Sequence, residues 1–154
     1  MSTVWSRAQL LITTAWVGSL WTIGYLVAPT LFKTLADQAL AGTIAGQLFF
    51  VEACLSLVCG IALLAIWFAQ HRRIHRKIVG MVLCTVVGFF ALHPFMADLR
   101  AAGLSDPDVR WKFGALHGLS SGFYLMQSII GAMLILELLD NKSDAKTKKE
   151  AVNQ

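Results

Sequence analysis

The sequence FGALHGLSSGFY, at residues 113–124, indicates best how this chain folds. Glycine recurs in it every four residues, which in a helix forms one narrow stripe of small residues. The three positions are Gly114, Gly118 and Gly122. Inside a bilayer such a stripe lets a second helix approach closely, as small-xxx-small motifs do. We therefore expect this helix to pack against another one through its glycines.

The stretch lies in one of four long apolar blocks. Of the 154 residues, 56% are hydrophobic and only 14% are charged, whereas a soluble domain has about 25% charged residues. Each block approaches the roughly 20 residues that a helix needs to cross a bilayer. The predicted helices cover about 8–32, 43–70, 77–99 and 112–139. The chain is thus expected to be an all-α polytopic membrane protein, an antiparallel four-transmembrane-helix bundle at 1–140 with a charged cytoplasmic tail at 141–154.

A second pair of glycines opens the second predicted helix. Gly42 and Gly46 are also four residues apart, so we expect helix packing there too. The three cysteines all lie inside apolar blocks. Their small and odd number does not suit a secreted disulfide framework, and we interpret them as small buried side chains.

The basic residues predict the orientation in the membrane. With four crossings, nine of the thirteen lysines and arginines fall on the side that holds both chain ends. Cytoplasmic loops carry the excess of basic residues, so we expect both termini in the cytoplasm. The net charge of +4 does not indicate nucleic acid, because no basic and aromatic residues alternate on a soluble surface. The expected partners are the lipid bilayer and either a second copy of the chain or another membrane protein.

Three ionisable residues lie inside the apolar blocks. Glu52, His93 and His117 come from three different predicted helices and fall at similar depth from the outer surface. Ser121 is one helical turn from His117. Ionisable side chains within a membrane usually face the interior of the bundle. We therefore predict a polar cluster in the outer half of the bundle.

This cluster has three competing interpretations. In the first, the polar groups hydrogen-bond to one another and organise the helices, as polar contacts often do in membranes. In the second, His93 and His117 bind haem b or a metal ion, and Met96 adds a soft ligand suited to copper. In the third, Glu52 exchanges protons along a path for protons or solutes.

Covalent catalysis is not expected. Ser120 and Ser121 lie near His117, but serines inside membrane helices usually bond back to their own backbone. The chain has no H-E-x-x-H or C-x-x-C motif. We therefore expect a protein that is not an enzyme.

Four short motifs resemble those of one known family. They are W-x-G-x-L-W-x-x-G-Y-x-x-A-P-x-L-F at 16–32, A-G-x-x-A-G-x-L-F at 41–49, the pair His93-Pro94, and F-x-x-L-H-G-x-S-S at 113–121. Together they resemble the transmembrane-protein-205-like family, a domain of unknown function found in bacteria and eukaryotes. The resemblance implies a four-helix membrane protein without an established activity. The compact chain is similar to a bacterial form, which implies the cell inner membrane.

Overall fold

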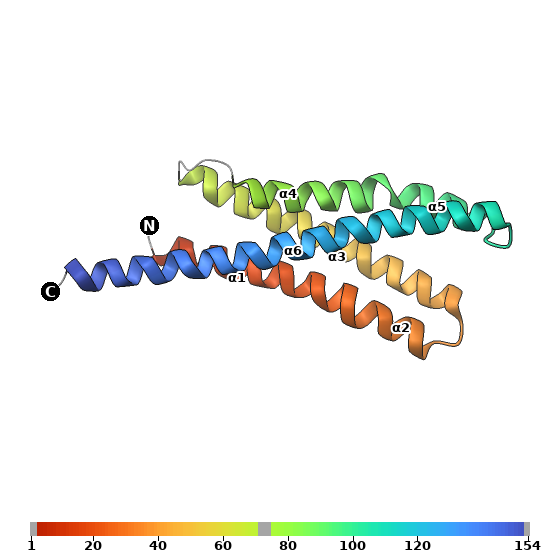
Figure 1. Cartoon of the computed structure of the whole chain (residues 1–154), viewed down its shortest axis with the longest axis horizontal. Helices are drawn as coiled ribbons and strands as arrows, with labels where there is room; N and C mark the ends of the chain where they lie inside the picture. Colours follow the sequence, from red (N-terminus) through yellow and green to blue (C-terminus); the bar gives the residue numbers. More distant parts are fainter. Residues whose placement is uncertain (1–2, 71–74, 153–154) are drawn as a thin grey trace.

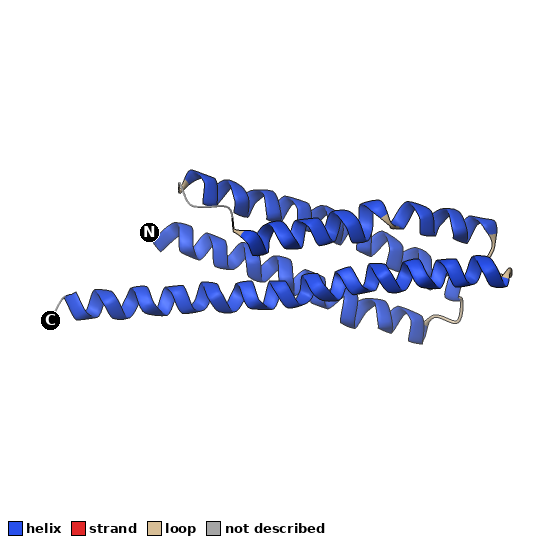
Figure 2. Ribbon diagram, turned by 45° about the horizontal axis from the view of Figure 1, so that its top comes forward, coloured by secondary structure: helices blue, strands red, loops and turns tan. Residues whose placement is uncertain are grey.

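The computed structural model describes residues 3–70 and 75–152, and the described residues form helices joined by short connections (Figure 2). The helices and two π-helical segments follow one another in four passes. They are α1 (Thr3–Trp21), η1 (Thr22–Val27) and α2 (Ala28–Thr34), then α3 (Gln38–Ala69), then α4 (Arg76–Thr85), η2 (Val86–Ala91) and α5 (His93–Ala102), and finally α6 (Pro107–Val152).

Each pass is long and apolar enough to cross a membrane. The four candidate spans are Val4–Thr34, Gln38–Ala69, Arg76–Ala102 and Pro107–Asp140. The predicted fold class is therefore confirmed: the chain is a helical membrane bundle. The fourth helix does not end near 139, because α6 continues to Val152. Its last segment, 141–152, contains four lysines and two alanines, which are strong helix formers.

An aspartate and a glycine define two of the helix ends away from the chain termini. Asp37 precedes α3, and its Oδ1 accepts hydrogen bonds from the backbone N–H groups of Ala39 and Leu40 at 2.9 and 3.1 Å. Such a cap satisfies donors that have no partner within the helix. Gly103 ends α5 with a positive φ of 96°, a conformation that glycine adopts without a steric penalty.

The passes contact one another more extensively in one half of the bundle than in the other. Both chain ends lie at the same end of the bundle (Figure 1), and α6 packs against both α1 and α4. We call the half that holds the chain ends the terminal half. The far half lies where α2 connects to α3 and α5 connects to α6. There, α2 diverges from α5 and α6 (Figure 1).

The main hydrophobic core lies in the terminal half. It is a cluster of buried side chains from α1, α3, α4 and α6, namely Trp16, Val17, Cys59, Leu63, Ile78, Met81 and Leu134. At the same end, Glu137 of α6 accepts a hydrogen bond from Lys77 Nζ at 2.6 Å, and His75 Nε2 lies 3.1 Å from its other oxygen. These contacts fix the start of α4 to α6.

The glycine stripe of α6 does not lie in a helix contact. Gly114, Gly118 and Gly122 are exposed, and a Cβ added at any of them would meet nothing within 4 Å. The predicted packing through this stripe is therefore wrong within the chain. The inner face of α6 is the opposite one, where a Cβ on Gly131 would lie 2.7 Å from Val17 Cγ2.

Candidate functional site

The inner face of α6 carries a row of polar side chains. Ser120, Tyr124, Gln127 and Ser128 are spaced by four, three and one residues, so they share one face of the helix. All four bond to groups on other passes; Ser128 receives a hydrogen bond from Tyr25 and also donates to the Tyr124 carbonyl on its own helix at 2.9 Å. This row connects α6 to the rest of the bundle.

Tyr124 is inserted into the backbone of the first pass. Its hydroxyl donates a 2.6 Å hydrogen bond to the Leu20 carbonyl and also bonds to the backbone of Gly24. Leu20 and Gly24 are four residues apart, so their carbonyl and N–H would bond to each other in a regular α-helix. A side chain inserted between them widens the turn. The π-helical segment η1 begins at this point, and its closing Ala28 N–H bonds five residues back to Ile23.

Ser120 makes a similar contact with the third pass. Its hydroxyl donates a 2.7 Å hydrogen bond to the Gly88 carbonyl, within the π-helical segment η2. In the same segment the Leu92 N–H bonds five residues back, to Val87 at 3.2 Å. A Cβ on Gly88 would lie 3.0 Å from the Cβ of Phe123. A larger residue at Gly88 would therefore require α6 and η2 to move slightly apart.

Beside this row lies a buried hydrogen-bond network centred on Ser56. Trp16 Nε1 donates to Ser56 Oγ at 2.6 Å, and Gln127 Nε2 donates to the same oxygen at 3.2 Å. The Ser56 hydroxyl donates in turn to Glu52 Oε1 at 2.7 Å. All four side chains are between 0% and 3% exposed. The network joins α1, α3 and α6, and it uses the full hydrogen-bonding capacity of the serine hydroxyl.

Glu52 also lines a small cavity. The cavity has a volume of about 30 Å³ and is lined by Glu52, Ala53, Cys84, Thr85, Gly88, Phe89, Ser120, Tyr124 and Gln127. This volume exceeds the roughly 10–15 Å³ that a buried water molecule needs. Among the described residues, Glu52 has no ion-pair partner. The site thus combines a carboxyl group, a water-sized space and several polar neighbours.

Phe89 lies between this cavity and a larger groove. The groove has a volume of about 490 Å³ and lies between α3 and the η2–α5 segment. We call it the polar groove; it is lined by Gly42, Thr43, Gly46, Gln47, Phe50, Phe89, Phe90, His93, Pro94 and Arg100. Phe89 is the residue that the groove and the Glu52 cavity share.

The histidines do not join Glu52 in one cluster. His93 lines the polar groove and stacks on Phe89 with ring centres 4.5 Å apart. His117 is exposed and stacks on Phe113, one turn earlier on its own helix. Ser121 is exposed as well. The prediction of one cluster containing all four residues is therefore wrong.

The lengths of the helices explain in part why Glu52 lies apart from the histidines. Because α3 begins at Gln38, Glu52 lies 14 residues inside it, or about 21 Å at 1.5 Å per residue. His93 lies nine residues from the end of α5, or about 14 Å. Glu52 consequently lies near the middle of α3, farther from the far end of the bundle than His93.

The predicted metal site is not assembled either. Met96 is buried, whereas His117 is exposed. Within the described ranges, no group of three or more histidine, cysteine, aspartate or glutamate side chains is placed to hold a metal ion. The structure therefore does not bring together the predicted ligands His93, His117 and Met96.

The two glycines at the start of α3 face the polar groove. A Cβ on Gly42 would lie 3.8 Å from the guanidinium of Arg100, and one on Gly46 would lie 4.0 Å from His93 Nε2. These are ordinary contact distances to flexible side chains. Arg100 also lies over the Phe113 ring, 5.3 Å from its centre. The pair thus leaves room for polar side chains and does not bring two helix backbones together.

Several residues of the site were not recognised from the sequence. Ser56, Tyr124 and Gln127 carry the network, yet the prediction favoured the glycine stripe on the opposite face of α6. The sequence did contain an indication of the inward face of α6. Ser120, Tyr124 and Gln127 are polar residues at helical spacing inside an apolar block, and such residues usually face the interior of a bundle. The glycines were equally periodic, and periodicity alone does not tell which face is inside.

Residues 11–105 match a protein family described as a domain of unknown function (DUF4149). The match covers more than half of the chain and includes the first three passes up to the connection before α6. Neither a curated protein nor a solved structure matched the sequence.

Proposed function

We propose that this chain, which belongs to the family described as a domain of unknown function (DUF4149), binds a proton at Glu52 within the membrane. One observation carries the proposal: Glu52 is 3% exposed, lines a water-sized cavity and has no ion-pair partner in the described ranges. An ionised carboxylate without a counter-charge is strongly unfavourable inside a bilayer. A proton is the simplest ligand that neutralises it. The function that this supports is a small proton-coupled transport component.

A route for the proton is part of the proposal. The polar groove brings Gln47, His93 and Arg100 together in the far half, where water has the shortest distance to enter. Phe89 lines both the groove and the Glu52 cavity. Rotation of this one side chain would connect the two spaces. Aromatic and other side chains change rotamers far faster than helices move, so no rearrangement of the bundle is required.

The site is suited to binding and not to covalent catalysis. A serine nucleophile needs an adjacent base that takes its proton. The Ser56 hydroxyl instead donates to Glu52 and accepts two further hydrogen bonds, while Ser120 donates to the Gly88 carbonyl. Ser121 is exposed on the other side of α6. We therefore propose that the protein is not an enzyme.

A purely structural role is the second candidate. It is favoured by Ser56, whose hydroxyl joins Trp16, Glu52 and Gln127 and so links three passes. Buried polar contacts of this kind hold membrane helices in register. In this case Glu52 serves the fold alone and carries no proton during function.

The family resemblance, the orientation in the membrane and the cellular location are also part of the proposal. The four motifs resemble the transmembrane-protein-205-like family, and the excess of basic residues near the chain ends favours cytoplasmic termini. A bacterial inner membrane is the location that we propose. The bilayer is the expected partner, and a second copy of the chain is the first protein partner to test.

Purified protein in liposomes tests the proton site directly. After an acid jump, a pH-sensitive dye inside the liposomes reports proton entry, and infrared difference spectra report protonated carboxyl groups. We expect Glu52→Gln to abolish both the proton entry and one carboxyl band. The matched control is Glu137→Gln, which makes the same chemical change at a carboxylate already paired with Lys77.

The two candidates give different results. Equal proton entry and an equal carboxyl band in wild type and Glu52→Gln would overturn the proton site. If wild-type liposomes take up no protons and Glu52→Gln mainly lowers the unfolding temperature, the structural role is the better account. Loss of the signal in Glu137→Gln as well would place the responsible group outside this site.

A further inference from the structure

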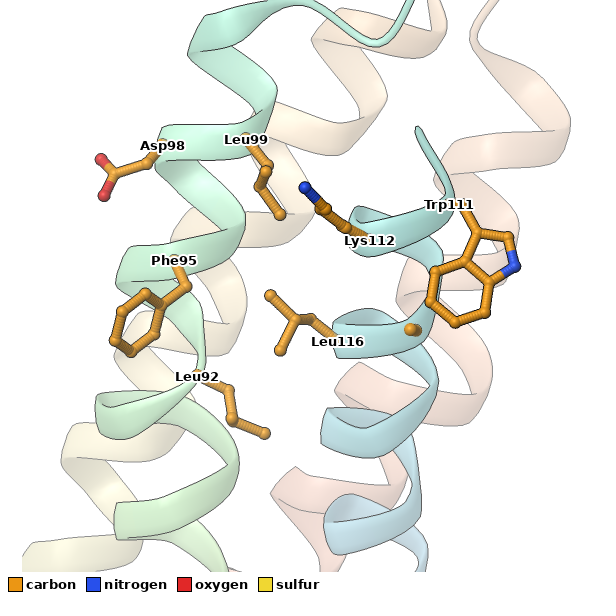
Figure 3. Close-up of a pocket in the computed structure, with 8 residues that line it drawn as sticks. Leu92, Phe95, Asp98, Leu99, Trp111, Lys112 and Leu116 are labelled. Atoms are coloured by element: carbon orange, nitrogen blue, oxygen red, sulfur yellow. The ribbon is translucent and has the colours of Figure 1, made fainter. Parts of the chain in front are cut away.

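A second groove lies on the outside of the bundle, between α5 and α6. It has a volume of about 620 Å³, and we call it the apolar groove (Figure 3). Its lining residues are Leu92, Phe95, Asp98, Leu99, Trp111, Lys112, Ala115 and Leu116. In Figure 3, Leu92 and Leu116 point into the space between the two helices. The groove therefore offers a hydrocarbon-like surface within a membrane span.

One cation lies at the mouth of this groove. The side chain of Lys112 extends into the space between α5 and α6 toward Leu99, whereas Asp98 points away from α6 (Figure 3). In the part of the chain that the structure describes, Lys112 has no ion-pair partner. The only acidic lining residue thus leaves the ammonium group unneutralised.

Polarity in the groove follows depth in the membrane. Lys112 lies five residues after the start of α6 at Pro107, or about 8 Å along the helix. Leu116 lies one turn deeper, and Trp111 is 75% exposed at the level of Lys112. Tryptophan and lysine at this level are typical of the lipid headgroup region. The charged end of the groove therefore meets headgroups, and its leucine end meets acyl chains.

We propose that the apolar groove binds an anionic phospholipid. The phosphate lies on the Lys112 ammonium, and one acyl chain lies along Leu116 and Leu92. Basic pockets between membrane helices bind acidic lipid headgroups. Here the pocket lies at the end of the bundle away from the chain termini, so the lipid would come from the leaflet opposite the termini. The proposal does not depend on the proton site, because the apolar groove and the Glu52 cavity share no lining residue.

Native mass spectrometry of the full-length protein tests this inference. Detergent-purified protein is titrated with phosphatidylglycerol or phosphatidylcholine of the same chain length, and the bound fraction is measured. We expect preferential binding of phosphatidylglycerol. Lys112→Gln, which keeps most of the side-chain length, should reduce that preference about fivefold, the factor that corresponds to the roughly 1 kcal/mol of one basic residue.

Two further variants sharpen the test. Arg110→Gln removes an exposed charge two residues away that does not line the groove, so it should leave the preference unchanged. Leu116→Trp fills the groove and should lower binding of both lipids. Circular dichroism and the unfolding temperature show whether each variant is folded, and Lys112→Met replaces Lys112→Gln if the latter fails this check.

Four outcomes would overturn the proposal. Equal binding of the two lipids by wild type would indicate non-selective surrounding lipid, and an unchanged preference in Lys112→Gln would exclude the ammonium. An equal loss in Arg110→Gln would show a general charge effect. Displacement of phosphatidylglycerol by millimolar inorganic phosphate, or by a second copy of the chain, would assign the groove to a different occupant.

Discussion

The two halves of the bundle differ in how completely their side chains fill the space between the helices. In the terminal half, large side chains such as Trp16, Met81 and Leu134 are at most 1% exposed. In the far half, α2 diverges from α5 and α6, and two grooves of about 490 and 620 Å³ lie on either side of α5. The terminal half is a closed core, whereas the far half offers surfaces to water and lipid.

The glycines show what distinguishes the halves. In the terminal half, a Cβ on Gly131 or Gly60 would overlap a valine of a neighbouring helix. In the far half, the side chains over Gly42 and Gly46 are the long polar ones of Arg100 and His93, at 3.8 Å or more. At these four positions, a glycine produces a tight helix contact where a stiff apolar side chain lies opposite. It leaves room for a polar side chain where a long flexible one lies opposite.

The largest expected effect tests this contrast with one pair of variants. Gly131→Leu would overlap Val17 and Met81, both almost completely buried, so we expect it to destabilise the bundle by about 3 kcal/mol. Gly118→Leu adds the same side chain where nothing lies within 4 Å, and it should change stability by less than about 0.5 kcal/mol. Reversible unfolding in detergent micelles measures both. A large loss in Gly118→Leu would reveal a contact with another molecule.

A smaller effect is expected at the border between the halves. Ser56→Ala removes the hydroxyl that joins Trp16, Glu52 and Gln127, and we expect a loss of about 2 kcal/mol for three hydrogen bonds in a membrane. Ser121→Ala, on the exposed face of α6, is the control and should be nearly neutral. Tryptophan fluorescence should also shift in Ser56→Ala because Trp16 loses its partner. Equal stability of the two variants would show that the network does not hold the helices together.

The smallest of the three effects concerns Tyr124. Tyr124→Phe keeps the ring and removes only the hydroxyl that bonds to Leu20 and Gly24, so we expect a loss of about 1 kcal/mol. Hydrogen exchange should increase at the Gly24 amide and not at amides of the terminal half. Tyr25→Phe, which also loses one hydroxyl bond but from a half-exposed ring, is the comparison variant. Unchanged exchange at Gly24 would contradict the insertion of the hydroxyl into the helix.

The membrane fold was predictable because length and hydrophobicity decide it. An apolar block of about 20 residues has few alternatives to a spanning helix. The helix ends were less predictable, since α3 begins at Gln38 and α6 at Pro107, several residues before the apolar blocks. The cap at Asp37 explains the first of these starts. Glu52 was predicted as a site residue. Its distance from the start of the helix was underestimated, because α3 begins at Gln38 and not near residue 43.

Ser56 is one helical turn from Glu52, but the meeting of Trp16 and Gln127 at its hydroxyl was not predictable from spacing. Trp16, Ser56 and Gln127 come from three passes, and their meeting depends on how the helices are rotated about their axes. Hydrophobic periodicity sets that rotation in a soluble bundle, but a membrane helix is apolar on all sides. The choice between the glycine face and the polar face of α6 therefore required the structure. The same ambiguity led to the incorrect grouping of His117 with Glu52.

The insertion of the Tyr124 hydroxyl into the first pass affects the orientation of α2, which follows η1. A π-helical turn contains one residue more than an α-helical turn. If the hydroxyl left and the turn closed to an α-helix, everything beyond it would rotate by about 100° and shift by about 1.5 Å. Lys33 and Phe32 would then point toward different neighbours. The Tyr124 hydroxyl on the fourth pass thus determines the direction in which α2 and its connection to α3 extend from the bundle.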